Sequence, residues 1–251
     1  MKYSIVTPSY NRPEALRKCI DSVLFQNHKD LEILIVNDSP LHEYSSLENY
    51  LLELKDNRVK YFKNKNNYGV NFSRNFALEN ISKDGDYIIF LDDDDWLHPN
   101  ALTELDNILE NTDNKKEKIN WLVTNRSVGE NSLTKNKTGR DMLNYFSDYL
   151  IFKRFTGDCT HAIKSEVAKR YKFSKLVKNG EEWTYFIQLP INMYYKNINT
   201  TNSDGYSPLG LNASMRKSYK TNTRILCREI KNSKMVMMLV LREINSLFRK
   251  N

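Results

Sequence analysis

The segment from Tyr87 to Leu97 constrains the fold of this chain more than any other. An apolar run ending at Leu91 is followed, without a spacer, by the four carboxylates Asp92 to Asp95. The run predicts a buried strand. Adjacent carboxylates raise one another's pKa, so a fold that keeps them together needs a cation beside them. A divalent metal bound through hard oxygen ligands is the simplest such cation; the alternative is a solvated acidic turn that caps a helix beginning near Pro99.

The first half of the chain alternates short apolar runs with amphipathic stretches, as βαβ units do. The expected strands are Tyr3–Thr7, Glu32–Asn37, Val59–Phe62, Tyr87–Leu91 and Asn120–Thr124, and the expected helices are Pro13–Gln26, His42–Leu54, Asn71–Ile81 and Pro99–Glu110. The pattern predicts an α/β fold with a mostly parallel sheet flanked by helices. The four carboxylates then follow a central strand, at the sheet edge where such folds bind ligands.

The second half is less regular. The sequence predicts a loop over Arg126–Thr138, a helix over Asp141–Phe152, a short strand over His161–Ile163, a polar, turn-rich segment over Asn197–Asn212, and a basic helical tail from Ala213 onward. In this tail Met237, Leu241, Ile244 and Phe248 share one face. That face either packs on the chain's own domain or lies on an anionic membrane surface.

Bulk composition excludes several classes of protein. No stretch approaches the roughly 20 apolar residues of a membrane span. Three widely spaced cysteines form neither a zinc motif nor a disulfide framework, which predicts a reducing, cytoplasmic location. The net charge of +7 favours anionic partners. No basic-aromatic module accompanies it, so we do not expect nucleic-acid binding.

Four other polar motifs stand where strands meet loops. They are Thr7-Pro8-Ser9-Tyr10-Asn11-Arg12-Pro13, Val36-Asn37-Asp38-Ser39, Asn67 to Asn75 with Gly69 and Arg74, and Asn179 to Phe186 with Glu181 and Glu182. Taken singly, each has a structural explanation: a helix capped near Asn11, a cap at Asp38, a surface ion pair for Arg74, and first-turn acids favoured by the helix dipole. Their functional readings are a base or ribose contact for Asp38, phosphate binding by Arg74 and a general base at the glutamate pair.

Together with the acidic cluster, these motifs resemble the inverting glycosyltransferases of family 2, which have the GT-A fold. The resemblance covers about residues 1 to 190. It implies transfer of one sugar, usually from a UDP-sugar, to a glycan or lipid-linked glycan acceptor, with Mn²⁺ or Mg²⁺ as cofactor. It also implies a catalytic domain over residues 1–212, with a nucleotide-binding half (1–125) and an acceptor-binding half (126–212), followed by the tail (213–251). Synthesis of a bacterial surface polysaccharide, at the inner face of the plasma membrane, is the expected setting.

The resemblance also assigns roles to single residues. The nucleotide-binding residues would be Thr7, Pro8, Tyr10, Arg12, Asp38, Asn67, Gly69, Arg74, Asp92 and Asp93, with Asp38 on the nucleobase. The metal ligands would be Asp92, Asp94 and Asp95, with Asp94 or Asp95 closest to the metal. Glu182 takes the place of the catalytic base, where the family usually has Asp, and Glu181 could share the role. Asn37 replaces the first acid of the usual pair. A glycosyltransferase-like subunit that binds nucleotide or a partner without turnover is the alternative function.

Overall fold

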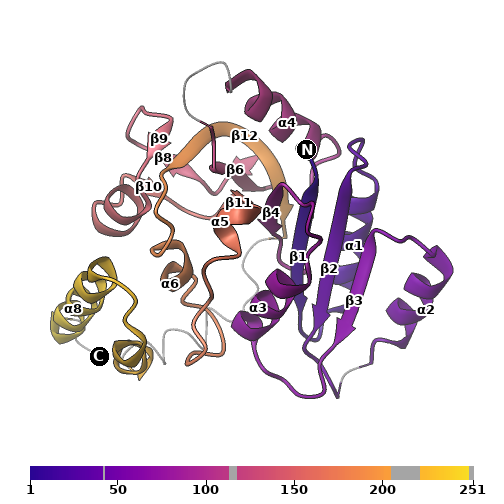
Figure 1. The fold of residues 1–251 in the computed structure, drawn as a ribbon, viewed down its shortest axis with the longest axis horizontal. Helices are drawn as coiled ribbons and strands as arrows, with labels where there is room; N and C mark the ends of the chain where they lie inside the picture. Colours follow the sequence, from indigo (N-terminus) through magenta and orange to yellow (C-terminus); the bar gives the residue numbers. More distant parts are fainter. Residues whose placement is uncertain (42, 113–117, 205–220, 249–251) are drawn as a thin grey trace.

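The computed structural model describes the chain except for residue 42 and residues 113–117, 205–220 and 249–251. One ten-stranded sheet runs through the molecule in the order β3-β2-β1-β4-β11-β6-β12-β5, with β7 paired to β6 and β9 paired to β12 (Figure 1). Its strands are β1 (Tyr3–Ser9), β2 (Leu31–Asn37), β3 (Val59–Lys63), β4 (Tyr87–Phe90), β5 (Asp95–Leu97), β6 (Trp121–Val128), β7 (Asn131–Ser132), β9 (Met142–Leu143), β11 (Cys159–Lys164) and β12 (Met193–Ser203). The strands β8 (Lys135–Asn136) and β10 (Phe155–Thr156) form a separate pair.

The sheet is mostly parallel, as predicted. Strand β1 pairs in parallel with β2 and β4, β2 with β3, and β6 with β12. Strand β11 lies antiparallel between β4 and β6, and joins the two parallel groups. The helices are α1 (Pro13–Leu24), α2 (Ser45–Leu54), α3 (Val70–Asn80), α4 (Ala101–Thr112), the π-helix η1 (Tyr145–Ile151), α5 (Ser165–Ala168), α6 (Trp183–Phe186), the 3₁₀-helix η2 (Cys227–Glu229) and α8 (Ser233–Phe248). Residues 221–226 are also helical.

Alternate residues of the central strands point into two separate apolar layers. On β1, Tyr3 and Ile5 join a core built with α1, α2 and α4, whereas Val6 joins a second core built with α3, α5, α6 and η1. Because both faces of the sheet are covered, β1 and β2 are buried along their whole length. The predicted elements of the first half are therefore all present, with ends that differ by a few residues.

The second half corrects three expectations. Strand β6 continues to Val128 and is followed by β7 and β8, where a loop was predicted, and η1 replaces most of the expected helix. Strand β12 occupies the first part of the predicted turn-rich segment. Its buried side chains include Thr200 and Thr201, whose hydroxyls pair with Thr124 at 2.6 Å and Thr160 at 2.7 Å. Since these core-facing residues are polar and satisfy one another, the apolar periodicity of a strand is missing from the sequence.

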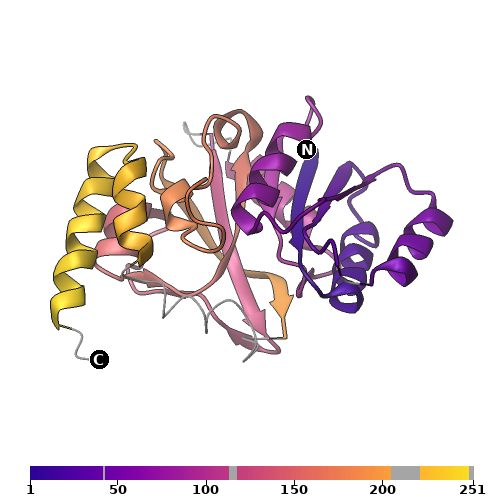
Figure 2. The same ribbon diagram turned by 90° about the horizontal axis from the view of Figure 1, so that it is seen from below.

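The C-terminal helix packs on the domain, but through a different face from the one predicted. Met235 and Leu239 are buried with Val177 and Leu226, while Met237 and Ile244 are exposed. Figures 1 and 2 both place α8 at the end of the molecule opposite α2 and β3. The predicted boundary at residues 212 and 213 lies outside the described residues, as does the side chain of Phe248. Within the parts of the chain that are described, no helix has the length and apolar character to cross a bilayer.

Candidate active site at the carboxyl ends of the strands

The acidic cluster is neutralised by three arginines from separate elements. Chain connectivity puts Asp92 to Asp94 between β4 and β5 and Asp95 at the start of β5, at the sheet edge that also receives the loops after β1 and β6. The pairs are Arg12 Nη1 with Asp93 Oδ1 (3.1 Å) and Asp94 Oδ2 (2.7 Å), Arg74 Nη2 with Asp92 Oδ1 (2.8 Å), and Arg126 Nη2 with Asp95 Oδ1 (2.6 Å). Guanidinium groups therefore supply part of the positive charge that the sequence analysis assigned to a metal. Arg126 was missed because its strand was read as a loop.

Two of the four carboxylates are open to solvent. The side chains of Asp92 and Asp94 are 41% and 27% exposed, whereas those of Asp93 and Asp95 are 7% and 4% exposed. Burial raises the pKa of Asp93 to about 6 against the pull of Arg12. Burial and then the charge of Asp92 raise the pKa of Asp95 to about 8. Asp95, expected as a metal ligand, thus lies under Arg126 rather than at the surface.

The open pair fits a divalent cation. Among the described residues, no three His, Cys, Asp or Glu side chains converge as a ready-made metal site. Mg²⁺, however, is commonly held by one or two carboxylates plus substrate phosphates. Burial and the nearby Asp92 raise the pKa of Asp94, so a cation beside these two oxygen donors would relieve a repulsion that the fold contains.

Arg74 connects the acidic cluster to the glutamate pair. It projects from α3 and is 6% exposed. Its Nη2 contacts Asp92, and its Nη1 donates to Glu182 Oε1 at 3.0 Å. The Glu182 side chain is itself 41% exposed. The predicted base therefore stands at the rim of the same site as the predicted metal-binding carboxylate, although 90 residues separate them in the sequence.

The loop that carries the two glutamates is docked on the start of α3. The Nδ2 of Asn71 donates to the carbonyls of Val177 (2.7 Å) and Gly180 (3.1 Å). Gly69 precedes α3 with φ of 94°, and a Cβ there would lie 2.4 Å from the Lys178 carbonyl oxygen. Only glycine allows this backbone conformation and this close approach. The motif around Gly69 thus serves to seat the loop of the proposed base.

Asp38 organises the same region from the other side. Its Oδ1 accepts from Tyr68 N (2.9 Å) and Asn64 Nδ2 (2.8 Å), and its Oδ2 accepts from Gly69 N (2.6 Å). The carboxylate is 4% exposed. The neighbouring Asn37 donates to Tyr61 Oη and accepts from Ser39 N. Asp38, expected to contact a nucleobase, therefore already holds the loop that includes Asn67.

The loop after β1 is tied to the acidic cluster and to α2. Pro8 lies two residues beyond Val6, the last β1 residue paired with β4, so its missing N–H breaks no hydrogen bond between these two strands. The backbone N–H of Tyr10 donates to Asp93 (3.2 Å), and the Tyr10 ring is half exposed. Thr7 is fully buried. Asn11 has a φ of 57° and does not cap α1, contrary to expectation.

Two unpredicted side chains hold this loop. The Ser39 hydroxyl accepts from Asn11 N (2.7 Å), and the buried Tyr44 hydroxyl accepts from Arg12 N (3.1 Å). Nothing in their local sequence marks them, because their partners are about 30 residues away.

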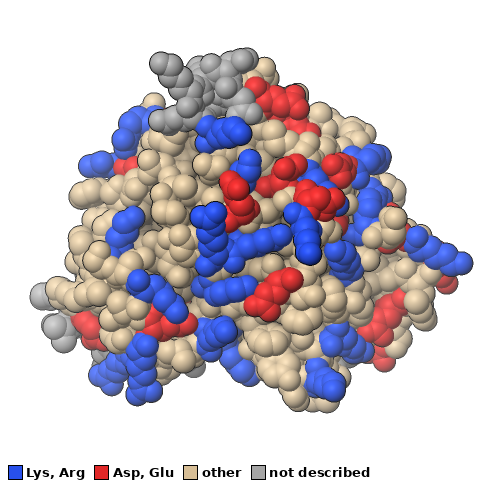
Figure 3. All heavy atoms as spheres, viewed as in Figure 1, with Lys and Arg blue, Asp and Glu red and all other residues tan. Residues whose placement is uncertain are grey.

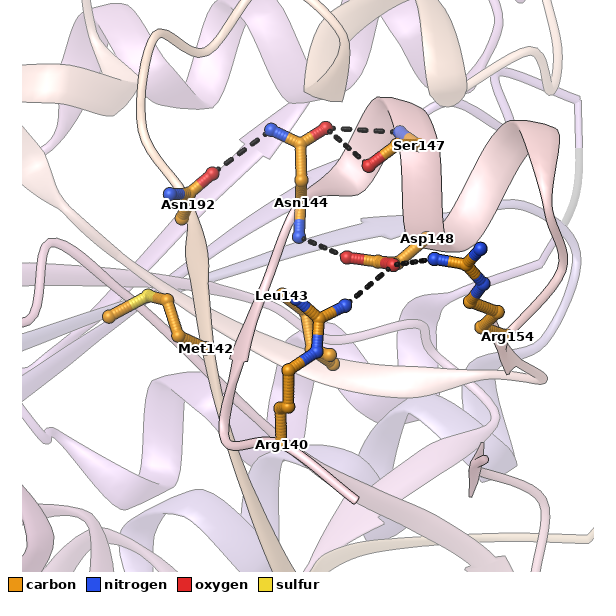
Figure 4. A pocket seen from close by; sticks show the side chains of 8 residues that line it. All are labelled: Arg140, Met142, Leu143, Asn144, Ser147, Asp148, Arg154 and Asn192. Atoms are coloured by element: carbon orange, nitrogen blue, oxygen red, sulfur yellow. Dashed lines mark hydrogen bonds and ion pairs between the residues drawn. The ribbon is translucent and has the colours of Figure 1, made fainter. Parts of the chain in front are cut away.

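A well-defined pocket lies away from these residues. It has a volume of about 440 Å³ and is lined by Arg140, Met142, Leu143, Asn144, Ser147, Asp148, Arg154 and Asn192 (Figure 4). Both arginines are committed to the buried Asp148, with Nη–Oδ1 distances of 2.9 and 3.6 Å. On the face drawn in Figure 3, Lys and Arg side chains form a band across the middle, and acidic side chains gather above this band.

A family model described as glycosyl transferase family 2 matches residues 4–176, more than two thirds of the chain. The chain belongs to glycosyl transferase family 2. Family 2 relatives include the Streptococcus pneumoniae glycosyltransferase GlyA (35% identity, 41% of this chain, 14% of the relative). Another is the Campylobacter jejuni GalNAc(5)-diNAcBac-PP-undecaprenol beta-1,3-glucosyltransferase (39%, 41% and 33%). An uncharacterised glycosyltransferase of Methanocaldococcus jannaschii is 28% identical over 76% of this chain and 65% of its own length. The chain thus spans less than two thirds of these relatives.

Solved structures confirm the GT-A fold of this family 2 chain. Residues 1–349 of S. aureus TarS in complex with UDP-GlcNAc give a TM-score of 0.72 at 14% identity, covering 95% of this chain and 70% of that one. The mannosyltransferase PcManGT from Pyrobaculum calidifontis, in complex with GDP-Man and Mn²⁺, gives 0.62 at 13% identity, covering 96% and 68%. At these identities the likeness concerns the fold alone.

Proposed function

We propose that this family 2 glycosyltransferase moves one hexose or N-acetylhexosamine from a UDP-sugar to a glycan or lipid-linked glycan, with inversion at the anomeric carbon. The setting we propose is bacterial surface polysaccharide synthesis at the cytoplasmic face of the plasma membrane. The name of the Campylobacter relative, with its undecaprenol-linked acceptor, and the UDP-GlcNAc complex of TarS support the acceptor and donor classes.

One observation carries the proposal: a single guanidinium, that of Arg74, contacts both Asp92 and Glu182. The carboxylate proposed to face the metal and donor, and the carboxylate proposed to activate the acceptor, therefore pair with the two terminal nitrogens of one guanidinium and belong to one site. Inverting transfer needs the base in the same site as the donor, because the base takes the proton of the acceptor hydroxyl while that hydroxyl attacks the anomeric carbon.

Each residue of the site has its own role in the proposed reaction. Glu182 takes the proton of the acceptor hydroxyl while that oxygen forms a bond to the anomeric carbon. The bond from this carbon to the diphosphate oxygen breaks, and its electron pair leaves with UDP. Arg12 and Arg74 stand beside the open carboxylates, where their donors suit diphosphate oxygens. Asp92 and Asp94 would hold Mn²⁺ or Mg²⁺, which when bound neutralises charge on the leaving diphosphate.

The test is Glu182→Gln, which keeps the size of the side chain but cannot take a proton. We expect sugar transfer from UDP-sugars to fall by about 10²–10⁴-fold, while the affinity for UDP stays near that of the wild type. Glu166→Gln, at an exposed position on α5, is the control and should transfer normally. If the wild type binds UDP but neither hydrolyses nor transfers any of a panel of UDP-sugars, the inactive binding subunit is the correct function.

We also propose that the exposed apolar face of α8 rests on an anionic membrane that holds the acceptor. The face consists of Val236, Met237, Val240 and Ile244, each 42–52% exposed, and the basic side chains of Arg224, Lys231 and Lys234 are also exposed. Basic residues near an anionic surface contribute ~1 kcal/mol each. The enzyme should sediment with phosphatidylglycerol vesicles at low salt, and Met237→Asn/Val240→Asn should not. Equal sedimentation of both proteins would contradict this.

A further inference from the structure

We propose that Arg242 of α8 is a positioning residue for catalysis: it holds Glu181, and through Glu181 it fixes the adjacent Glu182 against Arg74. This inference rests on the proposed function, because it assigns Glu182 as the base. It adds a role for the C-terminal helix, which the sequence treats as a separate tail. A helix that only packed on the domain, or only bound a membrane, would not need to contact the loop that carries the proposed base.

Glu181 is held by polar partners from two segments of the C-terminal region. Its Oε1 accepts from Arg242 Nη2 at 2.9 Å and from Asn222 Nδ2 at 3.2 Å. Its Oε2 accepts from Arg242 Nη1 and from Trp183 Nε1, the latter at 2.6 Å. The Glu181 and Arg242 side chains are each 8% exposed. A carboxylate that accepts four donors in a buried position is an anchor, not a base that an acceptor could reach.

Contacts other than the ion pair with Glu181 also hold the Arg242 side chain in place. Its Nε donates to Thr223 Oγ1 at 3.0 Å, and its guanidinium lies 5.5 Å from the centre of the Trp183 ring. The helix that carries it is seated by the buried side chains of Met235 and Leu239. Because the guanidinium of Arg242 is already oriented, its two Nη atoms can bind both oxygens of one carboxylate and fix the orientation of that carboxylate.

The backbone explains why this anchor bears on the next residue. Gly180 and Glu181 both lie in the left-handed region, with φ of 69° and 60°. Glu181 is not a glycine, so the conformation persists because surrounding contacts hold it. With the chain turned in this way, Glu181 contacts α8 while Glu182 contacts Arg74 of α3.

The glutamate loop is therefore clamped from two sides. On the α3 side, Asn71 Nδ2 donates to the Gly180 carbonyl; on the α8 side, Arg242 holds the Glu181 carboxylate. Consecutive Cα atoms are about 3.8 Å apart, so any shift at Glu181 is passed directly to Glu182. A misplacement of about 1 Å can cost about 10²-fold in rate.

The experiment compares Arg242→Met with Arg228→Met, which removes the same charge from an exposed site on η2 in the same C-terminal region. For Arg242→Met we expect the kcat for sugar transfer to fall by about 10–100-fold. The KM for the UDP-sugar and the Kd for UDP should change by less than about two-fold, since α3 and the acidic cluster are untouched. Arg228→Met should match the wild type in all three. Arg242→Lys, which restores a charge, should recover part of the kcat.

A second variant separates positioning from general loosening of α8. Met235→Ala removes a buried side chain from the same helix, and its kcat should remain near the wild-type value at temperatures where the protein is folded. If Arg242→Met does not fold, the comparison is made with Glu181→Gln, which keeps the size of the side chain and removes its charge, and which should show the same selective loss of kcat; Arg242→Lys should show a smaller loss.

Three outcomes would overturn the inference. One is a folded Arg242→Met with wild-type kcat while Glu182→Gln is inactive; the proposed function then stands and only the role of Arg242 fails. Another is an equal loss of kcat in Arg242→Met and Met235→Ala that follows their melting temperatures. Normal transfer by Glu182→Gln removes the proposed base itself, and with it the reason for positioning it.

Discussion

The Nη1 atom of Arg74 lies 3.0 Å from Oε1 of Glu182, so an arginine in the nucleotide-binding half of the sequence is in direct contact with the proposed base. The same guanidinium contacts Asp92. Arg74 is buried, and the charges of Asp92 and Glu182 outweigh desolvation and raise its pKa. We propose that this permanent cation couples donor binding to acceptor activation.

Replacement of Arg74 by lysine should leave one of the two carboxylates, Asp92 or Glu182, without its contact. Arg74→Lys keeps a positive charge, but an ammonium cannot span two carboxylates in the way that a planar fork does. We expect kcat/KM for transfer to fall by about 10–100-fold, measured with purified, folded enzyme. Arg58→Lys removes a comparable fork from Asp56, away from the site, and should leave transfer unchanged. Normal transfer by Arg74→Lys would contradict the bridging role.

Removal of divalent metal should stop the reaction. We expect transfer to vanish in chelator and to return with Mn²⁺ or Mg²⁺. Asp94→Asn should lower it by at least about 10²-fold without loss of fold, because repulsion from Asp92 is relieved. The control is Asp84→Asn, whose side chain is 72% exposed and paired with Lys2. Full activity after exhaustive chelation would show that Arg12, Arg74 and Arg126 suffice.

Gly69→Ala should unseat the glutamate loop. The new Cβ meets the Lys178 carbonyl oxygen at 2.4 Å in a backbone region that only glycine adopts readily. Such strain costs about 1–3 kcal/mol, so the melting temperature and the kcat should both fall. Gly129→Ala is the matched control: its φ is also positive (57°), but a Cβ there has nothing within 4 Å. It should lose some stability and no activity.

His161 should make stability depend on pH. Burial, and then the charge of Arg74, lowers the pKa of His161 to about 3, and its Nδ1 accepts from Trp121 Nε1 at 3.0 Å. Below pH 6.5 the unfolded chain binds a proton here and the folded chain does not. The free energy of unfolding should therefore fall with pH from about 6.5 towards 3, by up to about 1.4 kcal/mol per unit.

In His161→Asn the side-chain oxygen can still accept from Trp121, but it does not titrate. Urea unfolding between pH 4.5 and 7.5 should show a shallower pH slope for this variant than for the wild type. Identical slopes would mean that other groups carry the dependence.

Local patterns in the sequence already determined most of the first half of the fold. Apolar runs such as Tyr87–Leu91 and the helical periodicity of Pro13–Gln26 are properties of neighbouring residues, and they predicted the sheet that was found. The same patterns placed Asp92 to Asp95 and the motif of Arg74 where strands meet loops, and the resemblance to family 2 glycosyltransferases implied that they share one site. Residue types alone also indicated a cation beside the acids.

Only the tertiary structure decided which partner each charged group has. Four features required it: the arginine that pairs with each carboxylate of the acidic cluster, the burial of Glu181 with Arg242, the polar strand β12, and the face of α8 that packs. Each depends on contacts between residues far apart in the chain. A carboxylate has the same local sequence whether it faces an acceptor or a buried guanidinium, and its role is set by which of the two the fold brings to it.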